Sequence, residues 1–116
     1  MNPIENYKVK LFVPSEYGKK CISTTNGWMS QFIGDHNRID TANSVVNNIE
    51  KVLSGIQTEW IGENLGMQLV LVDSKETKIY QSSEEWYNNP KILPDFILPT
   101  IDFKIIVESW IDYLKN

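Results

Sequence analysis

The sequence of 116 residues has little of several features that define common protein classes. It contains one cysteine, Cys21, so no disulfide can form within the chain, which is typical of a reducing compartment. No apolar run approaches the roughly 18 residues that a membrane-spanning helix needs. The six glycines form neither a GxGxxG pattern nor a P-loop, so no phosphate-binding loop is predicted. The first ten residues have no apolar segment typical of a signal peptide, and we therefore expect a cytoplasmic protein.

Positive charge is also scarce. Eleven Lys and Arg residues stand against fifteen Asp and Glu, which gives a formal net charge of −4. The excess of acid is uneven, because residues 1–34 carry a net charge of +2 and residues 35–116 a net charge of −6. An acidic chain repels the phosphate backbone of nucleic acids and favours basic partners. We therefore expect a protein partner, with no direct nucleic-acid contact and no membrane contact.

Hydrophobic residues make up 41% of the chain, which is sufficient for one buried core. Apolar residues recur at steps of three and four from Asp40 to Gly55, and again from about Thr100, which predicts two amphipathic helices. Strand patterns cover residues 7–13, 57–62, 67–73 and 77–82. The sequence thus predicts a single α+β domain, residues 1–116, in which an antiparallel sheet of about four strands carries two main helices, mostly on one face.

Polar residues and glycine indicate where the helices begin and end. Asp35 or Asp40 is expected to cap the start of the first main helix, because an acidic side chain accepts free backbone N–H groups. Gly55 is expected at its end, since glycine tolerates a left-handed turn. Ser82 and Glu85 have the spacing of a capping box, which predicts one short helical turn through the aromatic residues that follow.

Two segments carry weaker patterns. Residues 18–35 have no clear period but contain an apolar patch, which predicts a short helix or an irregular segment at the edge of the core. Residues 92–99 are apolar but hold two prolines. We expect an extended crossing segment there more than a strand, because proline cannot donate to a sheet.

Two groups of reactive side chains suggest chemistry. Asp35, His36 and Asp40 have the side chains of a metal or acid–base site. However, His36 is the only histidine, and polar residues before a helix are typical of a capping loop, so we predict no metal and no cofactor. Cys21 and His36 have the side chains of a thiolate–imidazolium pair. Cys21 lies in no nucleophile motif, and an isolated cysteine more often packs in a core, so no catalytic residue is predicted.

The strongest indication of a binding surface is the occurrence of tryptophan beside pairs of glutamates at two places in the acidic part of the chain. Aromatic side chains fill pockets on a partner, while carboxylates speed the encounter with a basic surface. Trp110 lies on the apolar stripe of the last helix and is expected in the core, whereas Trp60 and Trp86 can be either core or surface residues. The predicted partner-binding residues are Glu59, Trp60, Glu63, Glu84, Glu85, Trp86 and Tyr87.

The chain also resembles a known family in its general sequence. Four features carry the resemblance: a basic N-terminal strand, the run Leu69-Val-Leu-Val-Asp-Ser-Lys-Glu-Thr-Lys-Ile-Tyr80, the run Ser82-Ser-Glu-Glu-Trp-Tyr87 and a closing helix that contains tryptophan. In these features the chain resembles the immunity proteins of bacterial polymorphic-toxin and contact-dependent growth inhibition systems. The resemblance implies a cytoplasmic protein, not an enzyme, that binds a cognate toxin domain and blocks its active site or holds it inactive. It also implies that the toxin is often a nuclease with a basic groove.

Two other classes remain open from the residues alone. One is a small enzyme or small-molecule-binding domain that uses Cys21 and His36, or a carboxylate pair. This class predicts a Cys21 thiol that alkylates much faster than a model thiol. The other is a structural subunit of a larger assembly, which predicts a stable oligomer without any toxin partner.

Overall fold

The computed structural model describes residues 2–14, 16 and 18–116 and has the predicted α+β class. Its helices are α1 (Pro3–Asn6), α2 (Gly27–Asp35), α3 (Ile39–Leu53), α4 (Ser83–Asn88) and α5 (Thr100–Lys115). Its strands are β1 (Lys10–Phe12), β2 (Cys21–Ser23), β3 (Trp60–Glu63), β4 (Leu69–Val72), β5 (Glu76–Tyr80) and β6 (Phe96–Pro99). Within the described part of the chain, every helix is too short or too polar to cross a membrane.

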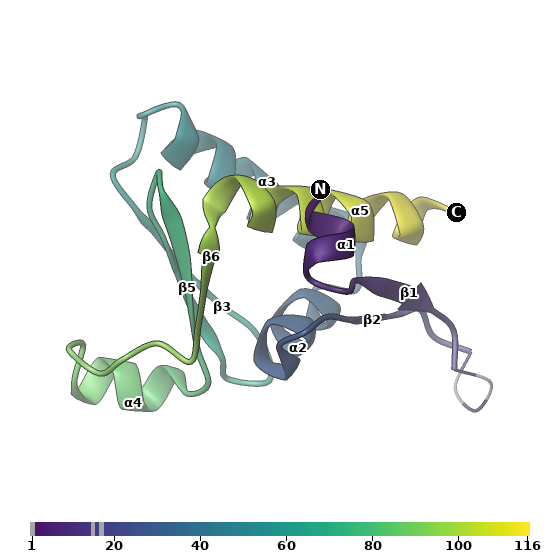
Figure 1. The fold of residues 1–116 in the computed structure, drawn as a ribbon, viewed down its shortest axis with the longest axis horizontal. Helices are drawn as coiled ribbons and strands as arrows, with labels where there is room; N and C mark the ends of the chain where they lie inside the picture. Colours follow the sequence, from purple (N-terminus) through teal and green to yellow (C-terminus); the bar gives the residue numbers. More distant parts are fainter. Residues whose placement is uncertain (1, 15, 17) are drawn as a thin grey trace.

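Strands β3 to β6 form one antiparallel sheet in chain order. The register places Ile61 opposite Leu71, Leu71 opposite Lys78, and Lys78 opposite Ile97. Since side chains alternate between the two faces along a strand, these four residues form one row on one face of the sheet. We call this the outer face. The opposite, inner face is directed toward α2, α3 and α5 (Figure 1).

The inner face and its helices enclose the hydrophobic core. Val70, Val72, Ile79 and Leu98 of the sheet belong to the same buried cluster as the apolar stripes of α3 and α5. Trp110 is fully buried, as predicted, and its indole N–H donates at 2.9 Å to the backbone carbonyl of His36, the C-cap residue of α2. Each fully buried large apolar side chain contributes about 1.5–3 kcal/mol. The prediction that the two main helices pack mostly on one face is confirmed.

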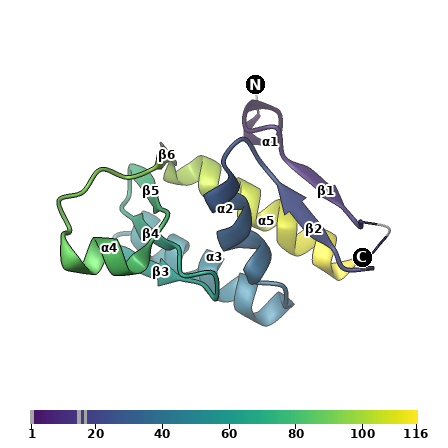
Figure 2. The same ribbon diagram turned by 90° about the horizontal axis from the view of Figure 1, so that it is seen from below.

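The outer face is covered only in part. Helix α4 lies on the side of the sheet opposite α2 and α5 (Figures 1 and 2). Leu69 and Tyr80, which are paired on neighbouring strands, are buried at that end of the sheet. Farther along the sheet, Ile61 is 37% exposed and Ile97 is 47% exposed. The outer face therefore leaves apolar side chains open to solvent beside α4.

The N-terminal segment does not join the main sheet, so the prediction that residues 7–13 form one of its strands is wrong. Only β1 is extended there, and it pairs with β2, which the sequence did not predict, in a separate two-stranded sheet. Lys8 has a φ of 51°, which turns the chain just before β1. The Tyr7 hydroxyl donates to Asp102 of α5 at 2.9 Å. These contacts hold the hairpin against α5 instead of the sheet.

The fourth place in the sheet belongs to β6, so the prediction of a crossing segment over residues 92–99 is wrong for its second half. Strand β6 pairs with β5 and lies at the edge of the sheet. Pro99 is its last residue, where the missing N–H of proline disrupts the least pairing. Leu98 is 1% exposed, so burial on the inner face favours the strand despite the flanking prolines.

The start of α3 also differs from the prediction, whereas its end agrees. The N-cap residue is Arg38, which makes no side-chain capping bond. Asp40 lies in the first turn of the helix, and Asp35 bonds to a different segment, so neither caps it. Gly55 directly follows the C-cap residue Ser54 and has a φ of 83°. That left-handed conformation is the reason for glycine at this position.

Candidate functional site

Helix α4 forms where the capping box predicted it. Ser82 Oγ accepts the backbone N–H of Glu85 at 3.2 Å. Glu84 and Glu85 lie in the first turn, where the positive end of the helix dipole favours carboxylates. The backbone N–H of Ser83 donates to the carbonyl of Met67 at 2.8 Å, which ties the start of α4 to the segment before β4. Both glutamates are exposed and form no ion pair within the described residues.

Trp86 packs between two tyrosines. Its ring centroid lies 6.3 Å from that of Tyr80 and 5.1 Å from that of Tyr87, the latter in an edge-on arrangement at 77°. Such pairs attract each other beyond their burial alone. Among residues 2–14, 16 and 18–116, the indole Nε1 of Trp86 is the buried side-chain polar atom without a hydrogen-bond partner. An unsatisfied buried donor costs about 1–3 kcal/mol, so α4 is not optimised for stability alone.

One hydrogen bond joins α4 to the edge strand β3. The Tyr87 hydroxyl donates to Glu63 Oε2 at 3.0 Å. This bond to the Glu63 carboxylate stabilises the protonated phenol and raises the pKa of Tyr87 above its usual value. Tyr87 is nevertheless 56% exposed, so its ring is held in place and still open to a partner. We call Glu63, Glu84, Glu85, Trp86 and Tyr87 the acid–aromatic surface.

Two of the predicted partner-binding residues lie apart from this surface. Trp60 is half-buried and packs against the core on the inner face. Its indole covers Gly62, where an added methyl group would clash with the ring. Glu63 points to the outer face, since it is three positions farther along the same strand. Glu59 directly precedes β3 and is exposed, and no hydrogen bond or ion pair joins its side chain to α4.

A polar network fixes the turn between β3 and β4. Asp35 Oδ2 accepts both Asn64 Nδ2 and the backbone N–H of Gly66, each at 2.8 Å. Asn64 Nδ2 also donates to Gln68 Oε1 at 2.7 Å, and Asn64 Oδ1 accepts the Gln68 backbone N–H at 2.7 Å. Gln68 is 3% exposed. The sequence did not predict this network, because it joins α2 to a turn 31 residues away.

Asp35, His36 and Asp40 have separate partners. The Nδ1 atom of His36 lies 2.7 Å from the carbonyl oxygen of Phe32. Asp40 pairs with Arg38 at 2.9 Å, and both side chains are largely exposed. Within the part of the chain that the structure describes, no three His, Cys, Asp or Glu residues are placed to hold a metal ion.

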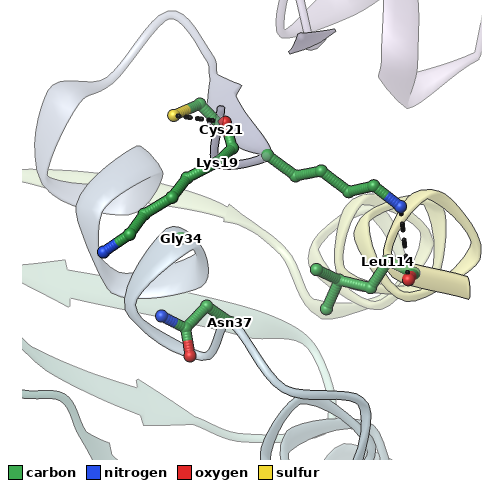
Figure 3. Close-up of a pocket in the computed structure, with 6 residues that line it drawn as sticks. Lys19, Cys21, Gly34, Asn37 and Leu114 are labelled. Atoms are coloured by element: carbon green, nitrogen blue, oxygen red, sulfur yellow. Dashed lines mark hydrogen bonds between the residues drawn. The ribbon is translucent and has the colours of Figure 1, made fainter. Parts of the chain in front are cut away.

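Cys21 lies at the start of β2 and lines a cavity of about 580 Å³ together with Lys19 and Asn37 (Figure 3). Its Sγ atom lies 3.7 Å from the carbonyl oxygen of Lys19. His36 lines a different cavity, of about 420 Å³. The structure therefore does not join Cys21 and His36 by a hydrogen bond.

The chain was also compared with known proteins. No family model matches it, and no curated protein or solved structure matches it significantly.

Proposed function

We propose that this protein is an inhibitory binding protein that contacts a basic protein partner through the acid–aromatic surface. The observation that carries the proposal is the fixed but exposed ring of Tyr87, bonded to Glu63 and one helical turn from the free carboxylate of Glu84. Such a ring loses little conformational freedom when a partner covers it. Free carboxylates around it attract positive charge at long range.

The nature of the partner follows from charge and from the resemblance to immunity proteins. The chain has a net charge of −4. The four glutamates among the predicted partner-binding residues lie on α4, on β3 or directly before β3. A basic substrate groove of a nuclease toxin is complementary to such a surface. We infer that the partner is a cognate toxin domain, neutralised in the cytoplasm by occlusion of its active site. A small enzyme that uses Cys21 and His36 has less support, since the two residues line separate cavities.

The test begins with identification of the partner. Tagged protein is incubated with lysate of the native host at low and at high salt, and the bound proteins are identified by mass spectrometry. The partner is then produced separately, and its association rate is measured over a series of NaCl concentrations. We expect a stoichiometric basic protein whose association slows as salt rises and whose activity is lost in the complex.

Two charge-reversed variants decide whether the acid–aromatic surface is responsible. Glu84→Lys with Glu85→Lys changes the net charge by the same amount as Glu108→Lys with Asp112→Lys on exposed positions of α5. We expect the first variant to associate at least about tenfold more slowly at low salt, with a flatter salt dependence, and the second to change the rate by less than about threefold. Equal rates for the two variants would contradict the proposed surface, and a bound but fully active partner would contradict inhibition.

A further inference from the structure

A second cavity adjoins the acid–aromatic surface. It has a volume of about 420 Å³ and lies between the α2–α3 connection and the turn that joins β3 to β4. Glu63 belongs to both places, because it accepts the Tyr87 hydroxyl and also lines this cavity. The volume is within the range of small-molecule sites and is sufficient for one long side chain. A partner seated on the acid–aromatic surface would therefore reach this cavity directly.

Three side chains that line the cavity, those of Asp35, Glu63 and His36, have a second polar atom beyond the one that is already bonded. Asp35 uses Oδ2 for its two bonds to the turn, and its Oδ1 has no bond to any described residue. Glu63 likewise uses only Oε2. His36 Nδ1 faces the carbonyl of Phe32, which can only accept, so this contact favours the tautomer with its proton on Nδ1, in which Nε2 is an acceptor. Two carboxylate oxygens and one imidazole nitrogen thus remain for a ligand.

The charge of the lining favours a cation. Asp35 and Glu63 are acidic, and the cationic side chain in the lining, Arg38, pairs with Asp40 at 2.9 Å. Leu65 lies at the same cavity and is 91% exposed, which provides an apolar contact for the methylene groups of a long basic side chain. A planar guanidinium can donate to several acceptors at once, whereas an ammonium acts as a compact point charge. Arginine fits this acceptor set better than lysine.

We propose that this cavity binds an arginine side chain of the protein partner. The inference rests on the proposed function, because the partner supplies the arginine. The guanidinium donates to the free oxygens of Asp35 and Glu63 and to Nε2 of His36, and the methylene groups pack on Leu65. This contact would add geometric specificity to the long-range attraction of the acid–aromatic surface.

The site can be tested before any partner is known. The probe is Nα-acetyl-arginine methylamide, and its control is the citrulline analogue, which has the same shape without the charge. His36 is the sole histidine of the chain, so its ring protons give a single NMR reporter inside the cavity. We expect a saturable shift of these protons with arginine, with a dissociation constant in the millimolar range, and at least about fivefold weaker binding of citrulline. Equal shifts with both probes, or none with arginine, would overturn the site.

Glu63→Gln and Glu108→Gln form a matched pair of variants. Each removes one negative charge, and Glu108 lines a different cavity on α5. Glutamine at position 63 can still accept the Tyr87 hydroxyl, so the fold is expected to persist, as checked by circular dichroism. We expect Glu63→Gln to weaken the arginine probe about threefold to tenfold and Glu108→Gln to leave it unchanged. Equal affinities in the two variants would refute the role of Glu63.

The same measurements separate failure of this site from failure of the proposed function. The arginine site would be refuted if partner binding depended on Glu84 and Glu85 but not on Glu63, and if the His36 ring protons did not shift with the arginine probe. That result would not contradict the inhibitory function. A shift of the His36 ring protons with arginine but not with citrulline would support the site, even if no partner were found whose binding depends on Glu84 and Glu85.

Discussion

Replacement of Asp35 tests the network that shapes both the β3–β4 turn and the wall of the second cavity. In Asp35→Ala, the backbone N–H of Gly66 and one N–H of Asn64 lose a charged acceptor at 2.8 Å. Hydrogen bonds to charged groups contribute about 1.5–3 kcal/mol each. Asn64 keeps its bond to Gln68, and Asp35, Asn64 and Gly66 are only partly buried, so water replaces part of the loss. We expect the free energy of unfolding to fall by about 2–3 kcal/mol in Asp35→Ala, and by about 1 kcal/mol in Asp35→Asn, whose amide oxygen still accepts.

Urea denaturation measures this effect. With a slope of about 1–3 kcal/mol per molar for a domain of this size, the midpoint of Asp35→Ala should fall by about 1–2 M. Asp112→Ala is the matched control, because Asp112 is exposed and its carboxylate bonds to no described residue. Amide exchange at Gly66 should quicken in Asp35→Ala and not in the control. A midpoint for Asp35→Ala equal to that of Asp112→Ala would refute the stabilising role of the network.

Three further predictions concern stability. In urea denaturation, Thr100→Val should lower the free energy of unfolding by about 2–3 kcal/mol and Thr77→Val by about 1 kcal/mol. The reason is that the Thr100 hydroxyl donates to a backbone carbonyl at 2.7 Å and accepts from Thr77 at 2.9 Å in the core. Equal losses in the two variants would contradict this order. The hydrogen bond from the backbone N–H of Glu76 lowers the pKa of Asp73. The stability that this bond contributes above about pH 4 should therefore be lost as the pH falls further, and Asp73→Asn should lose less stability over the same range. Parallel acid-unfolding curves for the two proteins would contradict this prediction. Burial raises the pKa of Tyr7 to about 12, so stability should be lost as pH rises from 10 to 12, a loss that Tyr7→Phe removes and that alkaline unfolding curves measure.

The helices could be predicted from the sequence because their signals are local. The period of apolar residues in α3 and α5 places one stripe on the core without reference to the rest of the chain. The cap of α4 needs only the Ser82 hydroxyl and a backbone N–H three residues later. The short helix allowed for residues 18–35 is present as α2. Each of these elements depends on contacts within a few residues.

The pairing of strands could not be predicted, because it depends on contacts between distant residues. Residues 7–13 have the pattern of a strand with one buried face, but the place of β1 is determined by its pairing with β2 and by the bond of Tyr7 to α5. β6 holds Pro99, and its burial against α5 outweighs the local preference against a strand. Asp35 has the local features of a helix cap, yet it bonds to Gly66 in a distant turn.

The candidate site was predicted in part for the same reason. Glu84, Glu85, Trp86 and Tyr87 lie on one short helix, so sequence proximity alone groups them. The contact of Tyr87 with Glu63 spans 24 residues and requires the fold. Trp60 and Glu63 are close in sequence, but the alternation of side chains along β3 places them on opposite faces of the sheet. Residues that are close in sequence therefore share one short helix in α4, whereas in β3 they are divided between two faces of the sheet.

The two faces of the sheet differ in the hydrogen bonding of their buried polar groups and in the exposure of their apolar side chains. This difference supports the proposal of a binding role for the outer face. On the inner face, the buried hydroxyls of Thr77 and Thr100 are bonded to each other and to a carbonyl. On the outer side, the buried indole N–H of Trp86 bonds to no residue that the structure describes, and Ile61 and Ile97 are exposed. Selection for stability alone would favour polar residues at such exposed positions and a bonded indole. Because Ile61 and Ile97 lie on the same face of the sheet as α4, contact of this face with another molecule is a physical reason for the chain to retain these features.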